Sequence, residues 1–139
     1  MCGICGIWRN NDTEQIRSMM KTLVHRGPDG EGMFFSRQGC FGHCRLSIMD
    51  PEGGRQPIYN EDHAKAVIAN GEIYNFRDLR KQMADRHHWR TASDSEVILH
   101  LFEERGPEAA AMLDGMFAFA IADGDEFFVA RDPIGIKPL

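Results

Sequence analysis

Apolar residues near the start of the chain recur at the spacing of a helix. They occupy positions i, i+3, i+4 and i+7 and comprise Ile16, Met19, Met20 and Leu23. The Asn-Asp-Thr triplet at residues 11–13 precedes them, and because these residue types cap helix N-termini, we expect an amphipathic helix with a buried methionine stripe. The apolar, β-branched run at residues 2–8 predicts a strand before this helix.

Further along, short runs rich in apolar, β-branched and aromatic residues predict several strands. They cover residues 32–36, 40–48, 57–60, 65–69, 115–122 and 126–131. The Asp123-Gly124 pair between the last two runs is a strong hairpin signal. Gly-Pro and Asp-Gly pairs at residues 25–30, and the Pro- and Gly-rich stretch 50–56, predict loops.

Two more helices are expected between these strands. The apolar face of the first holds Phe76, Leu79 and Met83. Asn75 stands ahead of it as a cap, and Ser93 and Glu96 have the spacing of a capping box for a second helix that ends at Gly106. Pro107 can open a further short helix. The order of these elements predicts an α+β layered fold, in which helices cover an antiparallel sheet.

Composition and charge narrow the range of partners. The 139 residues, 42% hydrophobic and 27% charged, are those of a soluble globular protein with one domain. The formal charge of −5, without a basic run, disfavours nucleic acid and anionic membranes. The longest apolar run, residues 116–122, is too short to cross a bilayer, and no secretion signal precedes it, so we expect a cytoplasmic protein.

The four cysteines admit a metal-site interpretation. They are Cys2, Cys5, Cys40 and Cys44, in a C-x-x-C and a C-x-x-x-C arrangement. With His25 and His43 as further ligands, a structural zinc site is an alternative to consider. The second pair is too loosely spaced for a zinc knuckle and falls in a predicted strand, so we predict no metal site. Disulfides are not expected in a reducing cytoplasm.

Cys2 directly follows the initiator Met1. If Met1 is removed, Cys2 carries both a thiol nucleophile and a free α-amine, whose ordinary pKa of roughly 7.7–8.0 suits a general base. Cys5, three residues along the same predicted strand, should face the opposite side. The alternative is that Cys2 is only a small buried hydrophobic residue.

Five segments carry polar residues that packing alone does not explain. They are residues 2–4, 25–29, 45–48, 70–72 and 93–96. Together, and in this order, they resemble the glutaminase domain of the class II glutamine amidotransferases, which are N-terminal nucleophile hydrolases. The words HRGPD, RLSIMD, QPIYN, NGEIYN, GMFAFAI and ARDPIGIKPL are most similar to the asparagine synthetase branch. The resemblance covers the whole chain and implies a layered αββα sandwich of antiparallel sheets and helices, here C-terminally incomplete.

The resemblance implies a role for each segment. The thiolate of Cys2 would attack the side-chain amide of glutamine, forming a γ-glutamyl thioester that water later hydrolyses. The oxyanion would be bound by the Asn70 side chain and the Gly71 backbone N–H. The substrate-binding positions are Arg45 for the α-carboxylate, Glu72 and Asp94 for the α-ammonium, and main-chain groups around Leu46, Ile48 and Met49.

Each of these positions also has an ordinary interpretation. Asn-Gly is a common turn pair, Arg45 and Glu72 could be solvated surface residues, and Asp94 could serve the N-terminus of a helix. We do not count His25 as the base, because the family uses the α-amine. The other histidines are interpreted as structural or solvated: His43, His63, His87, His88 and His100.

The chain lacks the Ser-Gly-Gly-x-Asp-Ser pyrophosphate loop of the synthetase domain that the resemblance implies. We therefore expect residues 1–139 to be a partial glutaminase domain, separated from an ammonia-accepting synthetase domain. ATP and Mg²⁺ would belong to that absent domain, and the glutaminase reaction would need no cofactor. A homodimer is compatible with the sequence. The alternatives are a glutaminase domain for another acceptor and a non-catalytic interaction module.

Overall fold

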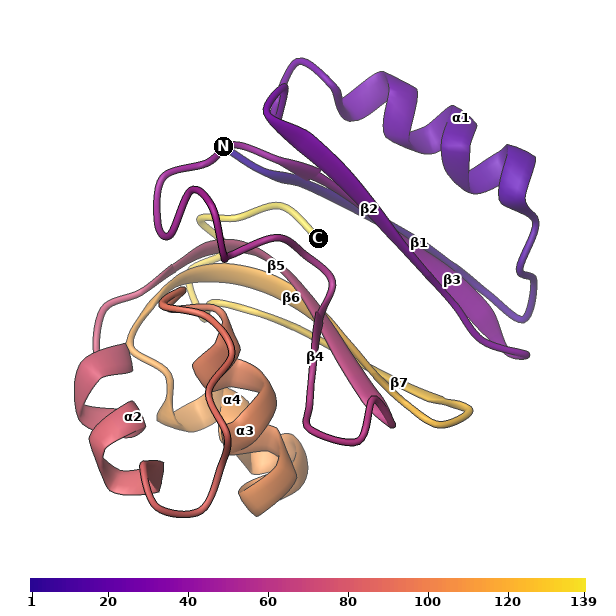
Figure 1. The fold of residues 1–139 in the computed structure, drawn as a ribbon. Helices are drawn as coiled ribbons and strands as arrows, with labels where there is room; N and C mark the ends of the chain where they lie inside the picture. Colours follow the sequence, from indigo (N-terminus) through magenta and orange to yellow (C-terminus); the bar gives the residue numbers. More distant parts are fainter.

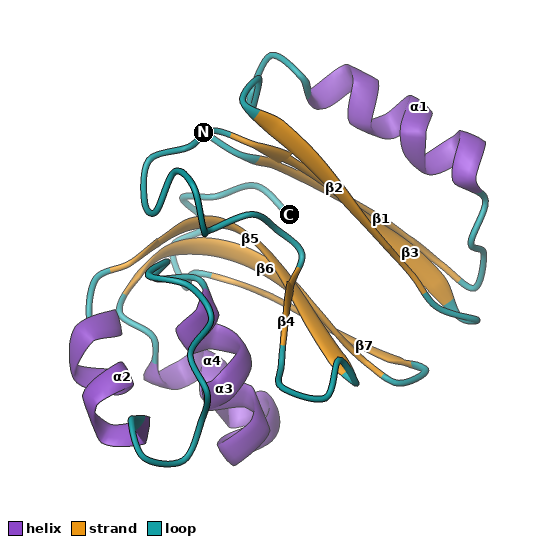
Figure 2. Cartoon of the chain, in the orientation of Figure 1, coloured by secondary structure: helices purple, strands orange, loops and turns teal.

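Two antiparallel sheets stack face to face, and helices cover their outer faces. The computed structural model describes residues 1–139 and places α1 on one outer side and α2, α3 and α4 on the other (Figure 1). Figure 2 shows the resulting order of layers as helix, sheet, sheet and helices. The first sheet has the strand order β1-β3-β2, and the second has the order β4-β5-β6-β7. None of the helices combines the length and apolar character needed to cross a bilayer.

The elements follow the predicted sequence of strands and helices. The first half contains β1 (Gly3–Trp8), α1 (Thr13–Leu23), β2 (Gly30–Phe35), β3 (Gly39–Arg45), β4 (Ile58–Tyr59) and β5 (Lys65–Ile73). The second half contains α2 (Phe76–Met83), α3 (Glu96–Arg105), a 3₁₀ turn η1 (Gly106–Glu108), α4 (Ala109–Met112), β6 (Gly115–Asp123) and β7 (Glu126–Arg131).

Helix α1 packs on the first sheet as its periodicity predicts. The side-chain carboxylate of Asp12 accepts hydrogen bonds from the backbone N–H groups of residues 14 and 15, which caps the helix N-terminus. Ile16 and Met20 are fully buried against the sheet. Met20 lies directly over Gly42 of β3, where a Cβ atom would come within 2.6 Å of the methionine side chain.

The second sheet carries the larger core. A cluster of 15 buried hydrophobic residues fills the space between this sheet and helices α2, α3 and α4. A smaller cluster of four buried residues lies between the two sheets: Phe41, Ile68, Ala120 and Ala122. Side chains alternate along β5 and β6, so the same two strands supply both clusters.

Four local predictions were wrong in whole or in part. Asn75 holds the N-cap position of α2, but its side chain makes no capping bond. The strand predicted at residues 65–69 extends to Ile73, because β6 pairs with β5 along its whole length. The strand predicted at residues 40–48 ends at Arg45. The capping box is not formed, because the Glu96 carboxylate accepts hydrogen bonds from the N–H groups of Arg90 and Thr91 and from the Thr91 hydroxyl. The α3 N-cap is the residue before Glu96, and its side chain makes no capping bond.

His43 joins the two sheets in the interior. Its side chain is buried, and Nε2 donates a hydrogen bond of 3.1 Å to the carbonyl oxygen of Ala69 on β5. Nδ1 has no hydrogen-bond partner. Burial penalises the charged imidazolium and lowers the pKa of His43 to about 4.

We predict that His43 makes the fold sensitive to acid. Because its folded-state pKa lies below the ordinary value of about 6.5, the unfolded chain binds the proton first, and stability is lost as the pH falls below 6.5. Between pH 7.5 and pH 5, the free energy of unfolding should fall by roughly 1–2 kcal/mol more in the wild type than in His43→Gln. Urea titrations at both pH values measure this, with exposed His88→Gln as the control. If the free energy of unfolding fell equally with pH in the wild type, His43→Gln and His88→Gln, the assignment of the acid sensitivity to His43 would be contradicted.

Candidate active site

One pocket brings together all nine residues that the sequence singled out. It has a volume of about 120 Å³ and lies where the chain start, the end of β3 and the second half of β5 meet. The nine are Cys2, Arg45, Leu46, Ile48, Met49, Asn70, Gly71, Glu72 and Asp94. Segments that are far apart in the sequence therefore form a single wall.

Strand β5 turns two of these side chains toward the pocket. Ile68 faces the first sheet, and because side chains two residues apart share a face, Asn70 and Glu72 point the same way. Asn70 is only 2% exposed, and its amide makes no hydrogen bond to another group of the chain. The amide is therefore available to a bound molecule.

The outer edge of β5 presents backbone donors to the same pocket. The N–H of Ala69 donates to Oε1 of Gln56 at 2.6 Å, and the N–H of Ile73 donates to Oδ2 of Asp94 at 2.7 Å. N–H groups two residues apart along a strand point to the same edge, so the N–H of Gly71 points out between them. Strand β4 pairs with β5 only at Ala66 and Val67 and does not reach Gly71. An unpaired backbone donor therefore lies beside the Asn70 amide.

The close approach of β6 also requires a glycine at position 71. A Cβ atom at this position would lie 2.1 Å from the carbonyl oxygen of Met116 and 2.6 Å from the Cα atom of Phe117. Only glycine fits that distance without moving the strands. The glycine thus serves the strand pairing and keeps the edge of β5 in the pocket wall.

The thiol of Cys2 lies at the end of β3. Its Sγ atom accepts a hydrogen bond of 3.3 Å from the N–H of Leu46, and its carbonyl oxygen accepts one of 3.1 Å from Nε of Arg26. Arg26 belongs to the HRGPD word, whose glycine, Gly27, packs against the backbone of Cys44. The predicted loop therefore positions the backbone that carries the thiol.

The same loop braces the segment that follows β3. The N–H of Asp29 donates to the carbonyl oxygen of Arg45 at 2.9 Å, and its carboxylate accepts from the N–H of Ser47 at 2.8 Å. His25 is exposed and does not line the pocket.

The guanidinium of Arg45 organises the connection after β3. Its Nη atoms donate to three consecutive carbonyl oxygens, those of Met49 at 3.1 Å, Asp50 at 2.6 Å and Pro51 at 3.0 Å. A guanidinium has five N–H donors, so two remain for an anion. These bonds fold residues 49–51 around the side chain. Strand β3 ends at Arg45 because its pairing with β1 and β2 ends there.

Negative charge also lines the pocket, at Glu72 and Asp94. Asp94 is buried, and burial together with the nearby Glu72 carboxylate raises the pKa of Asp94. A cation bound between the two carboxylates would relieve this unfavourable charge. The pocket therefore has donors for an anion near Arg45 and acceptors for a cation near Glu72 and Asp94.

Seven further residues, which the sequence analysis did not place in the site, line the pocket. They are Met1, Gly54, Gln56, Ala69, Ser93, Met116 and Lys137. Lys137 is buried, with Nζ 3.1 Å from the sulfur of Met1. Asp132 brings it there, because its carboxylate accepts the N–H groups of Phe117, Ile136 and Lys137. The ARDPIGIKPL word contains both Asp132 and Lys137. It was the sequence signal from which a role for these two residues could have been inferred.

The other three cysteines lie outside this pocket. The thiol of Cys40 donates to the carbonyl oxygen of Asn10, and that of Cys44 donates to the carbonyl oxygen of Met20 in α1. Burial raises the pKa of both thiols and raises that of Cys5 to about 11, so each favours the unreactive thiol form. The four-cysteine zinc arrangement is not formed, because Cys2 and the other three face different sides of the first sheet.

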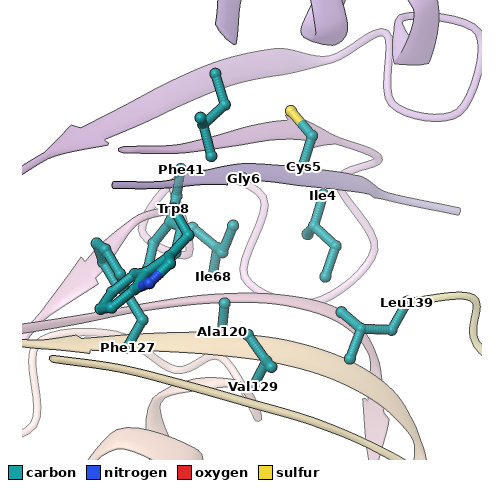
Figure 3. Close-up of a pocket in the computed structure, with 11 residues that line it drawn as sticks. Ile4, Cys5, Gly6, Trp8, Phe41, Ile68, Ala120, Phe127, Val129 and Leu139 are labelled. Atoms are coloured by element: carbon teal, nitrogen blue, oxygen red, sulfur yellow. The ribbon is translucent and has the colours of Figure 1, made fainter. Parts of the chain in front are cut away.

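A larger cavity, of about 480 Å³, lies between the two sheets (Figure 3). Ten of its 11 lining residues are hydrophobic, and none is charged. Ile4 points into it, while the sulfur of Cys5 turns toward the opposite side of the sheet, as predicted from its distance along the strand from Cys2. This cavity has no groups for acid–base chemistry, so the smaller polar pocket is the candidate active site.

Comparison with known sequences gives matches along the whole chain. Residues 1–139 match the family described as a glutamine amidotransferase domain. The chain is 47% identical to glutamine-hydrolyzing asparagine synthetase 3 of Arabidopsis thaliana, covering 100% of this chain and 25% of that protein. It is 42% identical to glutamine-hydrolyzing asparagine synthetase B of Escherichia coli, covering 100% of this chain and 26% of that protein. The chain thus spans about a quarter of these relatives.

Solved structures match the fold. The glutamine phosphoribosylpyrophosphate amidotransferase from B. subtilis, complexed with ADP and GMP, superposes with a TM-score of 0.84 and 26% identity, over 99% of this chain and 38% of that chain. A structure of the allosteric regulatory enzyme of purine biosynthesis gives a TM-score of 0.82 and 26% identity, over 97% of this chain and 38% of that chain. The predicted layered α+β fold of N-terminal nucleophile amidotransferases is confirmed.

We predict that Gly71→Ala destabilises the fold. The added methyl group would overlap the backbone of β6, so the free energy of unfolding should fall by about 2 kcal/mol or more. Gly30→Ala is the matched control, because nothing lies within 4 Å of a Cβ atom there. Urea denaturation compares the two variants. Equal stability of Gly71→Ala and Gly30→Ala would show that the strands do not approach as described.

Proposed function

Because this chain belongs to the family of glutamine amidotransferase domains, we propose that its pocket hydrolyses the side-chain amide of glutamine to glutamate and ammonia. The observation that carries the proposal is the shared pocket wall, in which the thiol of Cys2 lies with the Asn70 amide and the edge of β5 at Gly71. A nucleophile beside two convergent donors is the arrangement that acyl transfer requires.

The proposed reaction begins after Met1 has been removed. The free α-amine of Cys2 takes the thiol proton, and the thiolate attacks the amide carbon of glutamine. The amine then returns the proton to the leaving nitrogen, which departs as ammonia and leaves a γ-glutamyl thioester. Water attacks this thioester with the amine again as base, and glutamate and the free thiol are released.

Both tetrahedral intermediates carry negative charge on the former carbonyl oxygen. The Asn70 amide and the Gly71 N–H are the donors that we assign to this oxyanion. The Asn70 amide is unpaired, and the Gly71 N–H lies on a strand edge that no strand covers, so neither must break a bond first. Fixed donors of this kind stabilise the transition state more than the substrate.

The amino-acid end of glutamine fits the charge distribution of the pocket. We assign the α-carboxylate to the two remaining donors of Arg45 and the α-ammonium to Glu72 and Asp94. Main-chain groups around Leu46, Ile48 and Met49 complete the substrate-binding wall. This division of charge favours a free amino acid as substrate.

We further propose that the ammonia serves asparagine synthesis in a larger protein. The named relatives of 42–47% identity are asparagine synthetases, whereas the structurally similar phosphoribosylpyrophosphate amidotransferase is 26% identical. In this proposal, a synthetase domain outside residues 1–139 uses ATP and Mg²⁺ to transfer ammonia to aspartate. A cytoplasmic location and a homodimer belong to the same proposal. A different ammonia acceptor is the second candidate.

We predict that a glutamine-like diazo-ketone labels Cys2 and no other cysteine. Glutamine should protect against the label, and intact-mass analysis should show that the labelled protein has lost Met1. Cys2→Ala should abolish both labelling and glutamine hydrolysis, while Cys5→Ala should retain both. Glutamine-protected label on Cys40 or Cys44, with Cys2 unmodified, would refute the assignment. The absence of labelling and hydrolysis in a cooperatively melting protein would support a non-catalytic module.

We predict that Asn70→Ala lowers kcat for glutamine hydrolysis by roughly a hundredfold or more, with little change in KM. The loss of an oxyanion donor affects the transition state and leaves substrate binding largely intact. Glu72→Gln should instead raise KM, because it removes a charge that holds the substrate ammonium. Steady-state kinetics of both variants separate the two roles. A KM effect without a kcat effect would reassign Asn70 to substrate binding.

A further inference from the structure

A second cluster of polar side chains lies outside the candidate active site. Its members are Glu61, His87, His100 and Glu103, each of which offers one ligand atom, and these atoms all lie within 4.8 Å of one another. None of the four lines the pocket that contains Cys2. They come from the β4–β5 turn, the α2–α3 connection and helix α3.

Three of the six distances between these atoms are close to those of neighbouring ligands on one metal ion. Oε2 of Glu103 lies 2.9 Å from Nδ1 of His100 and 3.5 Å from Nδ1 of His87. Nδ1 of His87 lies 3.5 Å from Oε1 of Glu61. Ligands bound at about 2.05 Å around a tetrahedral zinc ion are about 3.3 Å apart, which falls within this range.

The second nitrogen of each imidazole faces a further carboxylate. Nε2 of His87 lies 3.2 Å from Oε1 of Glu104, and Nε2 of His100 lies 3.5 Å from Oε1 of Glu96. A histidine that binds a metal through one nitrogen usually directs the N–H of the other to a carboxylate, which fixes the tautomer. His87 thus has Nδ1 without a hydrogen bond and an acceptor opposite Nε2. Nδ1 of His100 contacts Oε2 of Glu103 directly, a contact that a metal ion between the two atoms would replace, and its buried Nε2 has no hydrogen-bond partner.

The two carboxylate ligands are held in place by separate contacts. Oε1 of Glu61 accepts a hydrogen bond of 2.8 Å from the N–H of His88. Oε1 of Glu103 accepts one of 2.7 Å from the Asn60 amide, which leaves Oε2 directed at the two imidazoles. The Glu61 side chain is 37% exposed, so solvent provides a route for an ion.

We propose that Glu61, His87, His100 and Glu103 form a binding site for a divalent transition metal, with Zn²⁺ as its ligand. Two imidazoles and two carboxylates suit Zn²⁺ better than Ca²⁺ or Mg²⁺, which prefer oxygen ligands. Four carboxylates surround the two imidazoles, and Arg86 pairs with one of them, Glu104. A divalent cation would balance the remaining negative charge better than neutral rings do. None of the four residues takes part in the proposed glutamine reaction.

The metal would add to the hydrogen bonds that already join three segments. It would tie the β4–β5 turn to α3 and to the connection that leads from α2 toward Asp94. The link continues through Glu96, which lies beside His100 and accepts the N–H groups of Arg90 and Thr91. We therefore assign the ion a structural role that supports the loop carrying Asp94.

Titration of the EDTA-treated protein with Zn²⁺ alone tests the proposal. Calorimetry should give one Zn²⁺ per chain, and the melting temperature should rise with Zn²⁺ concentration. Co²⁺ should give visible absorption without a thiolate charge-transfer band, which excludes the cysteines as ligands. His87→Gln and Glu61→Gln should bind at least tenfold more weakly, and Glu104→Gln should lose roughly 10–100-fold in affinity.

His88→Gln is the matched control, because its side chain is exposed and only its backbone contacts Glu61. It should bind Zn²⁺ as the wild type does. Glu61 is partly exposed, so Glu61→Gln is expected to fold even if a change at His87 does not. Failure of the wild type to bind one Zn²⁺, or unchanged affinity in Glu61→Gln and His87→Gln, would overturn the site. Neither result bears on labelling of Cys2.

Discussion

The pairing of β5 with β6 is the interaction on which the rest of the structure depends. Nine residues of β5 pair with nine of β6, from Lys65 opposite Asp123 to Ile73 opposite Gly115. One face of this pair supports the helices and the larger core, while the other meets the first sheet. After Val67, β5 has no strand partner on the side of β4. The candidate active site lies along this unpaired edge of β5.

Around this rigid pair, buried charged side chains hold the loops by bonding to backbone atoms. Arg45 binds three carbonyl oxygens, and Asp94 and Asp132 accept backbone N–H groups. Glu96 does the same for the segment before α3. A buried charge that is hydrogen-bonded costs much less than an unpaired one, so these contacts fix loops that have no regular structure. The pocket therefore gains its shape from polar contacts rather than from the hydrophobic cores.

Much of the fold could be predicted because its signals are local. The spacing of Ile16 and Met20 identified α1, and Asp123-Gly124 identified the last hairpin. The resemblance to the family located nine of the residues that line the pocket, although their roles stay predictions. The extension of β5 to Ile73 could not be predicted, because it depends on pairing with a strand about 50 residues away. The bonds of Glu96 were missed for the same reason, since sequence spacing cannot tell which of several nearby N–H groups a carboxylate reaches.

The alternation along β5 also limits how the length of this chain can change during evolution. A one-residue insertion or deletion between Lys65 and Asn70 would turn Asn70 and Glu72 toward the helices, because every later side chain would change face. Selection should therefore remove such insertions and deletions even where they hardly change the amino-acid composition of the strand. The largely exposed connection at residues 36–38 between β2 and β3 lines no part of the pocket, so its length can vary more freely. Gains and losses of residues should accumulate in connections of that kind, while the length of β5 stays fixed.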